Sequence, residues 1–299
     1  CLTGSSAGGL STFLHTDRVA ARLKEQAPNC HTIRSAPGFH YGGYFIDHEN
    51  FMHTSGGAPN TPGWEANATY PAKMRNIYTM QNLTFGEDGG LTLACRKLFP
   101  AEPWKCFMAP HLAPHIETPL FLFNSRFDAW QLGNVLQIGR LPLDSRDRQQ
   151  AVLQYGEDFL AQLKPVYAGT AGESMNGGFI TSCICHGCQW SDLQLEGKSS
   201  YQHYSDWWYG KTAPGTASMH IDTRGPNGNG TLPVGKGNCT QFLPTPPTPP
   251  TPRSPTPPTP PTPAPPVNPK CATAIAKDCP ARNYTTEKAC RSCVRDHLP

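Results

Sequence analysis

The chain has 299 residues, with 25 Lys and Arg against 22 Asp and Glu, and a formal net charge of +3. So small a positive excess favours neither nucleic acid nor a membrane surface as a partner. The sequence has no apolar run that predicts a signal peptide or membrane insertion, and it begins with Cys1 rather than methionine. We therefore expect a processed chain or a fragment of a longer one.

The first predicted element is a sharp turn at Gly4-Ser5-Ser6-Ala7-Gly8, which matches the G-x-S-x-G nucleophile elbow of α/β-hydrolases. A serine hydroxyl is a weak nucleophile, so it must stand clear of its backbone where a histidine can reach it. So tight a turn leaves space only for small residues at Gly4, Ala7 and Gly8. We predict Ser6 as the nucleophile and Ser5 as its permissive neighbour.

A helix is predicted directly after this turn, because Leu10, Phe13 and Leu14 recur at the i, i+3, i+4 spacing of an apolar helix face. The N-terminal amides of such a helix point at the serine, so we predict the backbone amide of Ala7 as an oxyanion donor. Residues 1–3 are expected to be the end of a buried strand. The strands that precede the elbow in a full α/β-hydrolase sheet are then missing.

Strands and helices are predicted to alternate along the rest of the first 242 residues. Aromatic and glycine-rich residues 39–52 predict a strand end and a loop, and apolar periodicity predicts helices at about 70–83 and 145–164. The apolar run at 118–124 is typical of a buried parallel strand, and residues 178–182 predict a further short one. This alternation indicates a parallel sheet with flanking helices, in three α/β layers.

Two candidate partners for Ser6 follow the predicted strands. Asp128 comes just after the first of these strands and His186 just after the second, where the carboxyl ends of parallel strands gather catalytic groups. The order Ser6, Asp128, His186 is that of α/β-hydrolases. His186 would move the proton and Asp128 would hold its ring. The alternatives are that Asp128 is only a helix cap and that the base is another histidine: His15, His40, His48, His111, His115 or His203.

Twelve cysteines and five N-x-[ST] sequons indicate the secretory pathway and disulfide bonds. Cys95 and Cys106 bracket a short loop and are predicted to bridge each other. The alternative for Cys183, Cys185 and Cys188 is a zinc or redox site. A structural zinc site needs a second pair of ligands, and the next close pair lies near the C-terminus, so we expect disulfides and no metal. The sequons are Asn67, Asn82, Asn229, Asn238 and Asn283.

The composition changes after residue 242, which predicts three parts. Residues 1–242 would form a partial esterase domain, and the Pro- and Thr-rich residues 243–270 a stiff polyproline linker. Residues 271–299 carry four cysteines and are too few to fold on apolar burial alone, so two disulfides are expected to hold a small module. Its pairing stays open, and it could bind polymer or protein or be an inert cap.

Four segments resemble the pectin acetylesterases of plants and their relatives, the Notum carboxylesterases of animals. The resemblance covers roughly residues 1–210. It rests on residues 4–9 with Asp17, on residues 118–121 continuing to 127–131, on residues 179–183 with His186, and on residues 206–209. By this resemblance, Ser6, Asp128 and His186 match the nucleophile, acid and base of the family.

The resemblance implies a secreted serine carboxylesterase without metal or cofactor that removes O-acetyl groups from cell-wall polysaccharide. The sequence departs from the family in two places. The Gly-Gly-Gly-Trp-type loop that supplies further oxyanion amides is absent, and residues 35–38 read Ser-Ala-Pro-Gly where relatives usually carry Ser-Asp-Ala-Gly. Two alternatives stay open: a Notum-like esterase acting on a lipid acyl ester of a protein, and a catalytically silent matrix or binding protein.

Overall fold

The computed structural model groups residues Cys1–Ala21 and Ile33–Pro247 in one compact unit, and Arg22–Thr32 with Thr248–Pro299 in a second. The predicted linker and C-terminal module lie outside the described residues, so the three-part division stays a prediction. The structure describes residues 1–27, 29, 32–39, 41–51, 68–83, 91–138, 145–167, 175–187, 193–211 and 218–226.

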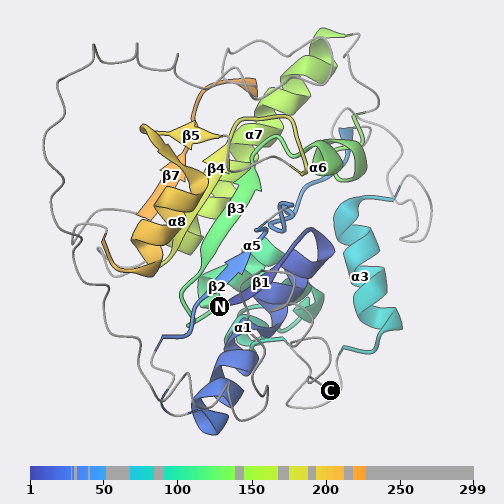
Figure 1. Ribbon diagram of the computed structural model, residues 1–299. Coiled ribbons are helices and arrows are strands. Elements are labelled where there is room, and N and C mark those ends of the chain that lie inside the picture. The colour runs from blue at the N-terminus through green and yellow to red at the C-terminus, as the bar shows by residue number, and fades with distance from the viewer. Residues whose placement is uncertain are drawn as a thin grey trace, which may run out of the picture. The chain divides into compact units, whose positions relative to one another are not determined.

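Parallel strands form the centre of the first unit (Figure 1). Strand β1 (Leu2–Gly4) pairs with β2 (Ser35–Pro37), and a parallel bridge between Ser35 and Leu120 places β2 beside β3 (Phe121–Ser125). Strand β4 (Gly177–Thr181) lies between β3 and β7 (Ser218–Ile221) and pairs with both in parallel. These five strands therefore follow the order β1-β2-β3-β4-β7, which confirms the predicted parallel sheet.

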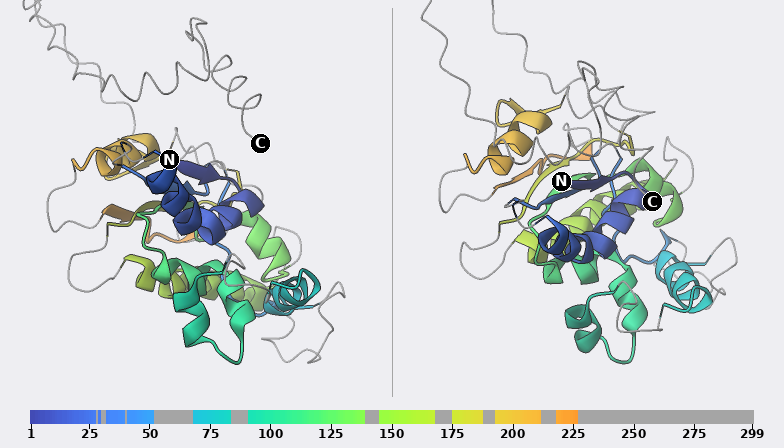
Figure 2. Two further views of the ribbon diagram at one scale, coloured as in Figure 1. Left: turned by 90° about the horizontal axis from the view of Figure 1, so that it is seen from below. Right: turned by 60° about the horizontal axis from the view of Figure 1, so that its bottom comes forward.

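Helices cover both faces of this sheet. Figure 2 shows α8 (Ser200–Trp208) on one face, with α1 (Ala7–Gln26) and α7 (Arg146–Tyr167) on the other. Alternating side chains of each strand serve the two layers: Phe121 and Phe123 share a cluster with Trp207 of α8, whereas Leu122 shares a cluster with residues of α1 and α7. Successive side chains of a strand point to opposite faces, and helices bury both faces of this sheet. The result is the three-layer arrangement expected from the sequence.

Shorter helices lie between these elements along the chain. A further β5–β6 hairpin, antiparallel, leads into α8. These elements are α3 (Tyr70–Met80), α4 (Leu93–Leu98), η1 (Pro103–Phe107), α5 (Ala109–Leu112), η2 (Ala113–His115), α6 (Ala129–Asn134), β5 (Gln194–Leu195) and β6 (Lys198–Ser199).

Strand β3 starts three residues later than the apolar run predicts. The amides of Glu117 and Thr118 donate to the carboxylate of Asp17 on α1 at 3.0 and 2.9 Å, and Pro119 has no amide hydrogen. The amide of Leu120 donates to the side chain of Asn176 at 2.9 Å. Side chains thus take the backbone donors that a strand would use, and before Phe121 the chain makes only an isolated bridge, between Leu120 and Ser35.

The cysteines of the described residues are mainly oxidised. Cys95 and Cys106 form the predicted disulfide, and Cys183 and Cys185 are also disulfide-bonded, which excludes both thiols as zinc ligands here. Cys1 is free and exposed, and Cys188 lies outside the described residues. Within the described part of the chain, none of the helices has the length and apolar character needed to cross a bilayer.

Candidate active site

Ser6 lies at the turn between β1 and α1, with φ at +53°. Its amide donates to the carbonyl of Tyr41 at 3.0 Å, which fixes this uncommon left-handed backbone conformation. A Cβ on Gly4 would lie 2.1 Å from the carbonyl oxygen of Gly8, so glycine is required at position 4. At Gly8 itself an added Cβ meets nothing within 4 Å, so this position has space for alanine as well as glycine.

The sequence pattern did not predict the contact between Gly9 and Gly43 that positions the helix after this turn. Gly9 faces Gly43, whose Cα would lie 2.8 Å from a Cβ at position 9. The first turn of α1 therefore packs directly on the backbone of the 41–47 segment. Ala7 is the first residue of α1, so its amide is among the helix N–H groups that have no acceptor within the helix.

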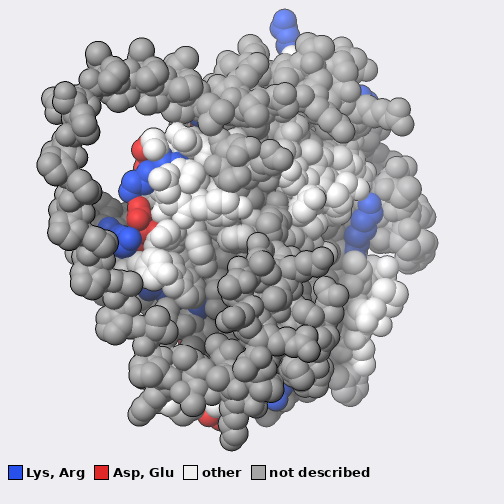
Figure 3. Space-filling view, in the orientation of Figure 1, with Lys and Arg blue, Asp and Glu red and all other residues white. Residues whose placement is uncertain are grey.

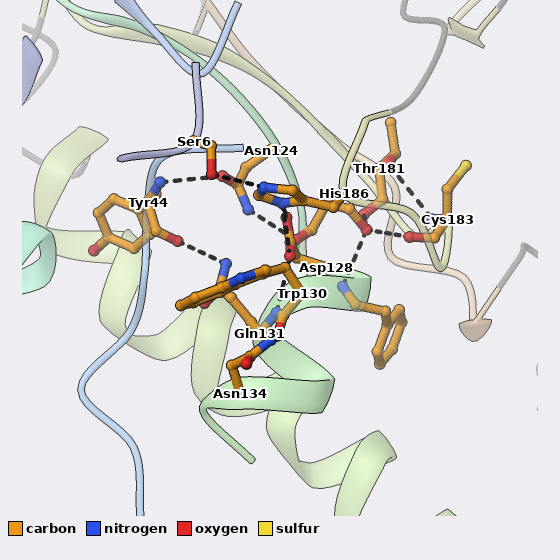
Figure 4. Close-up of polar contacts among 12 residues, drawn as sticks. Ser6, Tyr44, Asn124, Asp128, Trp130, Gln131, Asn134, Thr181, Cys183 and His186 are labelled. Atoms are coloured by element: carbon orange, nitrogen blue, oxygen red, sulfur yellow. Dashed lines mark hydrogen bonds and ion pairs between the residues drawn. The ribbon is translucent and has the colours of Figure 1, made fainter. Parts of the chain in front are cut away.

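Ser6, His186 and Asp128 lie in one hydrogen-bonded line (Figure 4). The Ser6 hydroxyl is 2.8 Å from His186 Nε2, and His186 Nδ1 is 2.8 and 3.1 Å from the two carboxylate oxygens of Asp128. With a neutral ring, Nδ1–H donates to the carboxylate and Nε2 accepts from the hydroxyl. The three residues come from the turns that follow β1, β3 and β4, as their order predicted.

Asp128 serves the histidine and caps a helix at once. Its Oδ1 accepts the amide of Gln131 at 3.0 Å, so it is also the N-cap of α6. Its side chain is fully buried. Burial raises the pKa of Asp128, while the hydrogen bond and charge of His186 and the amides of Gln131 and Trp130 act to lower it.

The turns that carry Asp128 and His186 are tied to each other beyond the triad. The amide of Arg126 donates to the carbonyl of Thr181 at 3.0 Å, and the Ser125 hydroxyl donates to the carbonyl of Cys183. Ser125 also accepts the amide of Phe127 at 3.1 Å. These bonds extend the β3–β4 pairing past the strand ends, and this holds the acid and the base at a fixed separation.

The segment 41–47 runs past the triad as an extended chain without strand pairing. Side-chain amides take its backbone donors instead: Tyr44 N donates to Asn124 at 3.1 Å and Ile46 N to Gln131 at 3.1 Å. Its end is held by Gln162 of α7, which accepts the amide of Asp47 at 2.9 Å. The predicted strand end at 39–52 is therefore a loop in residues 41–50, with β2 placed earlier at Ser35–Pro37.

The supporting side-chain amides of Asn124, Gln131 and Gln162 are only partly predictable from the sequence. The sequence contains Gln131 in a segment that resembles the family, and no pattern in it predicts a role for Asn124 or Gln162. A polar residue inside an apolar buried strand was the available signal for Asn124, because a fully buried amide must find hydrogen-bond partners.

Three of the other candidate histidines have hydrogen-bond partners away from Ser6. His48 pairs with Asp158 at 3.1 Å, and His111 pairs with Asp47 at 2.7 Å. His203 contacts the carbonyl of Leu195 at 2.9 Å. Among the described histidines, only His186 is hydrogen-bonded to Ser6, and His40 lies outside the described residues.

Three aromatic rings lie close to the ring of His186. The ring centroids of Tyr41, Trp130 and Phe45 lie 5.4, 6.2 and 6.4 Å from that of His186. Trp130 is 37% exposed, so one of these rings offers a face to solvent beside the triad. The site thus combines a serine hydroxyl that is hydrogen-bonded to a histidine with neighbouring aromatic rings.

A serine at a strand-to-helix elbow, with an acid and a histidine after later parallel strands, is the arrangement of the α/β-hydrolase class. The sequence model described as Pectinacetylesterase matches residues 1–231. The chain therefore belongs to the pectinacetylesterase family.

The curated relatives include both branches of this family. Pectin acetylesterase 4 of Arabidopsis thaliana is 28% identical over 228 residues, which cover 70% of this chain and 49% of the relative. The palmitoleoyl-protein carboxylesterase Notum of Drosophila melanogaster is 34% identical over 131 residues, 44% of this chain and 16% of the relative. The chain spans about half the length of the pectin acetylesterases it matches.

A solved structure of Notum from Drosophila, described as a Wnt deacylase, shares the fold. It superposes with a TM-score of 0.59 at 24% sequence identity and covers 78% of this chain and 58% of its own. The α/β-hydrolase-like architecture is therefore shown by an independent structure. The relatives are carboxylesterases by name, which supports esterase chemistry on acetyl or acyl esters for the family.

Proposed function

We propose that the protein is a secreted serine carboxylesterase that removes O-acetyl groups from cell-wall polysaccharide through an acyl-enzyme on Ser6. The observation that carries the proposal is the hydrogen-bonded line from Ser6 through His186 to Asp128, with 2.8 Å at both links. Family membership supports the ester as the bond attacked.

The proposed reaction has two displacement steps. The Ser6 oxygen attacks the ester carbonyl carbon as its proton passes to His186 Nε2, and the tetrahedral oxyanion faces the amide of Ala7. His186 then gives the proton to the leaving sugar alkoxide, which departs as an alcohol and leaves acetyl-Ser6. Water, deprotonated by His186, attacks that carbonyl and releases acetate, and Ser6 regains its proton. Asp128 stabilises the imidazolium in both steps.

Two features support the substrate and the compartment. The exposed face of Trp130 beside His186 suits an apolar sugar face, which packs on aromatic rings. The disulfide between Cys95 and Cys106, with disulfide-bonded Cys183 and Cys185, fits an oxidising compartment outside the cytosol. Acetylated cell-wall polysaccharide is the substrate class that the pectin acetylesterase relatives suggest.

The proposal is tested on the full-length protein with a series of p-nitrophenyl esters from acetyl to palmitoyl, and with acetylated pectin. We expect kcat/KM to be highest for the acetyl ester and acetate to be released from the polymer. A maximum at long acyl chains, with no acetate from pectin, would replace this substrate with a Notum-like lipid ester. Equal turnover by the protein and its Ser6→Ala variant on every ester would make the protein catalytically silent.

A further inference from the structure

Away from the triad, three side chains with metal-ligating atoms meet at β7, the last strand of the described sheet. Glu196 lies in the β5–β6 hairpin, His203 on α8 and His220 on β7, and one ligand atom from each lies within 4.8 Å of the others. Two imidazoles and a carboxylate are a donor set that suits Zn²⁺. We propose that Glu196, His203 and His220 form a binding site for a zinc ion.

The distances within the cluster are close to those of a zinc site. Zinc bonds of about 2.0–2.1 Å in a tetrahedron place ligand atoms roughly 3.3 Å apart. His220 Nδ1 lies 3.0 Å from Glu196 Oε2, so these two atoms already have that spacing. The rings of His203 and His220 are stacked, with centroids 3.6 Å apart and planes at 34°. The ligand atom of His203 lies within 4.8 Å of the other two and would move closer to them when an ion binds.

The environment of His203 prepares it as a ligand. Its Nε2–H donates to the carbonyl of Leu195 at 2.9 Å, which places the ring lone pair on Nδ1. A backbone carbonyl on the second ring nitrogen is the usual partner of a metal-bound histidine, because it fixes the tautomer and the ring orientation. His203 is buried, with 3% of its surface exposed, so the surrounding structure holds the ring in this orientation.

The cluster is also open enough for an ion to enter. The side chain of Glu196 is 67% exposed and that of His220 is 14% exposed. Charged side chains of both signs gather at the surface over β5, β7 and α8 (Figure 3). Lys198, in the same hairpin as Glu196, is paired with Asp206 at 2.7 Å, which reduces its repulsion of a cation.

A zinc ion bound here would join three elements that are otherwise held by packing and a few hydrogen bonds. The hairpin, α8 and β7 would each supply one ligand, and water would complete the coordination. Because binding to the folded state alone raises stability, the ion would stabilise the outer strand and helix of the sheet. The site shares none of its ligands with the triad and does not depend on the proposed ester hydrolysis.

The test uses the full-length protein, stripped of metal with a chelator and titrated with ZnCl₂ by calorimetry and by thermal unfolding. We expect one zinc site that raises Tm, and loss of at least about tenfold in that affinity in both Glu196→Gln and His220→Asn. His48→Gln is the matched control, since it removes a histidine–carboxylate pair, His48 with Asp158 at 3.1 Å, outside the cluster. This control should keep the site.

Equal zinc affinity and stoichiometry in the wild type and both variants would overturn the proposal, as would the absence of any zinc binding. The cluster would then consist only of the stacked rings of His203 and His220 and the pair between His220 and Glu196. Glu196→Gln alters a mainly exposed side chain, so it is decisive even where His220→Asn fails to fold. Replacing zinc with Co²⁺ separates this site from a thiolate site, because only thiolate ligands give the strong sulfur-to-cobalt absorption in the near ultraviolet.

Discussion

The fully buried carboxylate of Asp128 makes three kinds of contact. It accepts from His186, caps α6 through Gln131, and lies under Gly42, where a Cβ would come within 2.9 Å of its Oδ2. Burial raises its pKa, so the ionised form that the triad needs is less favourable in the folded chain than in water. The site thus holds a charge at some expense in stability, as catalytic groups often do.

The Asp128→Asn variant should lose activity without losing the fold. An amide facing Nδ1 favours the wrong tautomer of His186, so kcat should fall by about 10⁴-fold.

The same variant should change how stability depends on pH. The pKa of Asp128 is raised in the folded state, so the contribution of its carboxyl group to stability is present below the unfolded pKa and is lost as pH rises through the folded pKa. The free energy of unfolding of the variant should therefore improve relative to wild type as pH rises from 4 to 7, measured by urea unfolding. More than a tenth of wild-type kcat would contradict the role given to Asp128.

Two glycines near Ser6 should respond in opposite ways to alanine. In Gly42→Ala the new Cβ lies 2.4 Å from Asn124 Oδ1, so the variant should lose about 1–3 kcal/mol of unfolding free energy together with ester hydrolysis. In Gly8→Ala the Cβ meets nothing within 4 Å and the helix gains a better helix former, worth about 0.5–1 kcal/mol. Thermal unfolding of both variants measures the contrast. Equal destabilisation would show that the packing around the elbow is wrongly described.

At the scale of elements, the loop after β4 carries His186 and is anchored to the end of β7. Ser182 Oγ–H donates to Asp222 Oδ2 at 2.7 Å, and the guanidinium of Arg224 donates to the same carboxylate at 2.8 and 3.0 Å. The amide of Asp222 donates to the carbonyl of Ile180 at 2.8 Å, which continues the β4–β7 pairing. The outer strand thus stabilises the loop that holds the base.

Asp222→Asn should weaken this anchor in a pH-dependent way. Burial alone would raise the pKa of Asp222, but hydrogen bonds from Arg224 and Ser182 outweigh it and lower the pKa. The charge therefore stabilises the fold above the ordinary value of 3.8 and stops doing so as pH falls through the lower folded value. We expect a loss of about 1–3 kcal/mol at pH 7, which shrinks below about pH 4.

The measurement for Asp222→Asn is urea unfolding at pH 7, 5 and 3. Glu117→Gln provides the control, because Glu117 is exposed and its replacement should change the unfolding free energy by less than about 0.5 kcal/mol. A loss in Asp222→Asn that does not depend on pH would show that the charge of Asp222 contributes nothing.

Elements with a clear hydrophobic period were predictable from the sequence, and those built by long-range side-chain bonds were not. The helix expected at 145–164 is α7 at Arg146–Tyr167, and the helix expected at about 70–83 is α3 at Tyr70–Met80. The β5–β6 hairpin and β7 were not predicted, because two- to four-residue strands carry too little pattern. The 41–47 segment depends on Asn124, Gln131 and Gln162, which are distant in sequence.

For the whole molecule, chain order was the strongest predictor of the site. The order Ser6, Asp128, His186 and the rule that parallel strands present their carboxyl ends at one edge predicted residues that the structure brings together. The linker at 243–270, the module at 271–299 and their partners stay predictions, because they lie outside the described residues. The activity of the whole protein also stays a proposal, since the chain spans about half the length of the pectin acetylesterases that it matches.

The central claim is that the Ser6 hydroxyl is the nucleophile. Active-site labelling of the full-length protein tests it directly. A fluorophosphonate should form one covalent adduct per chain, found by mass spectrometry on Ser6 and not on Ser5. In His186→Ala the same adduct should form at least about 100-fold more slowly, because the general base is gone. Labelling at Ser5, or at equal rates with and without His186, would contradict the account.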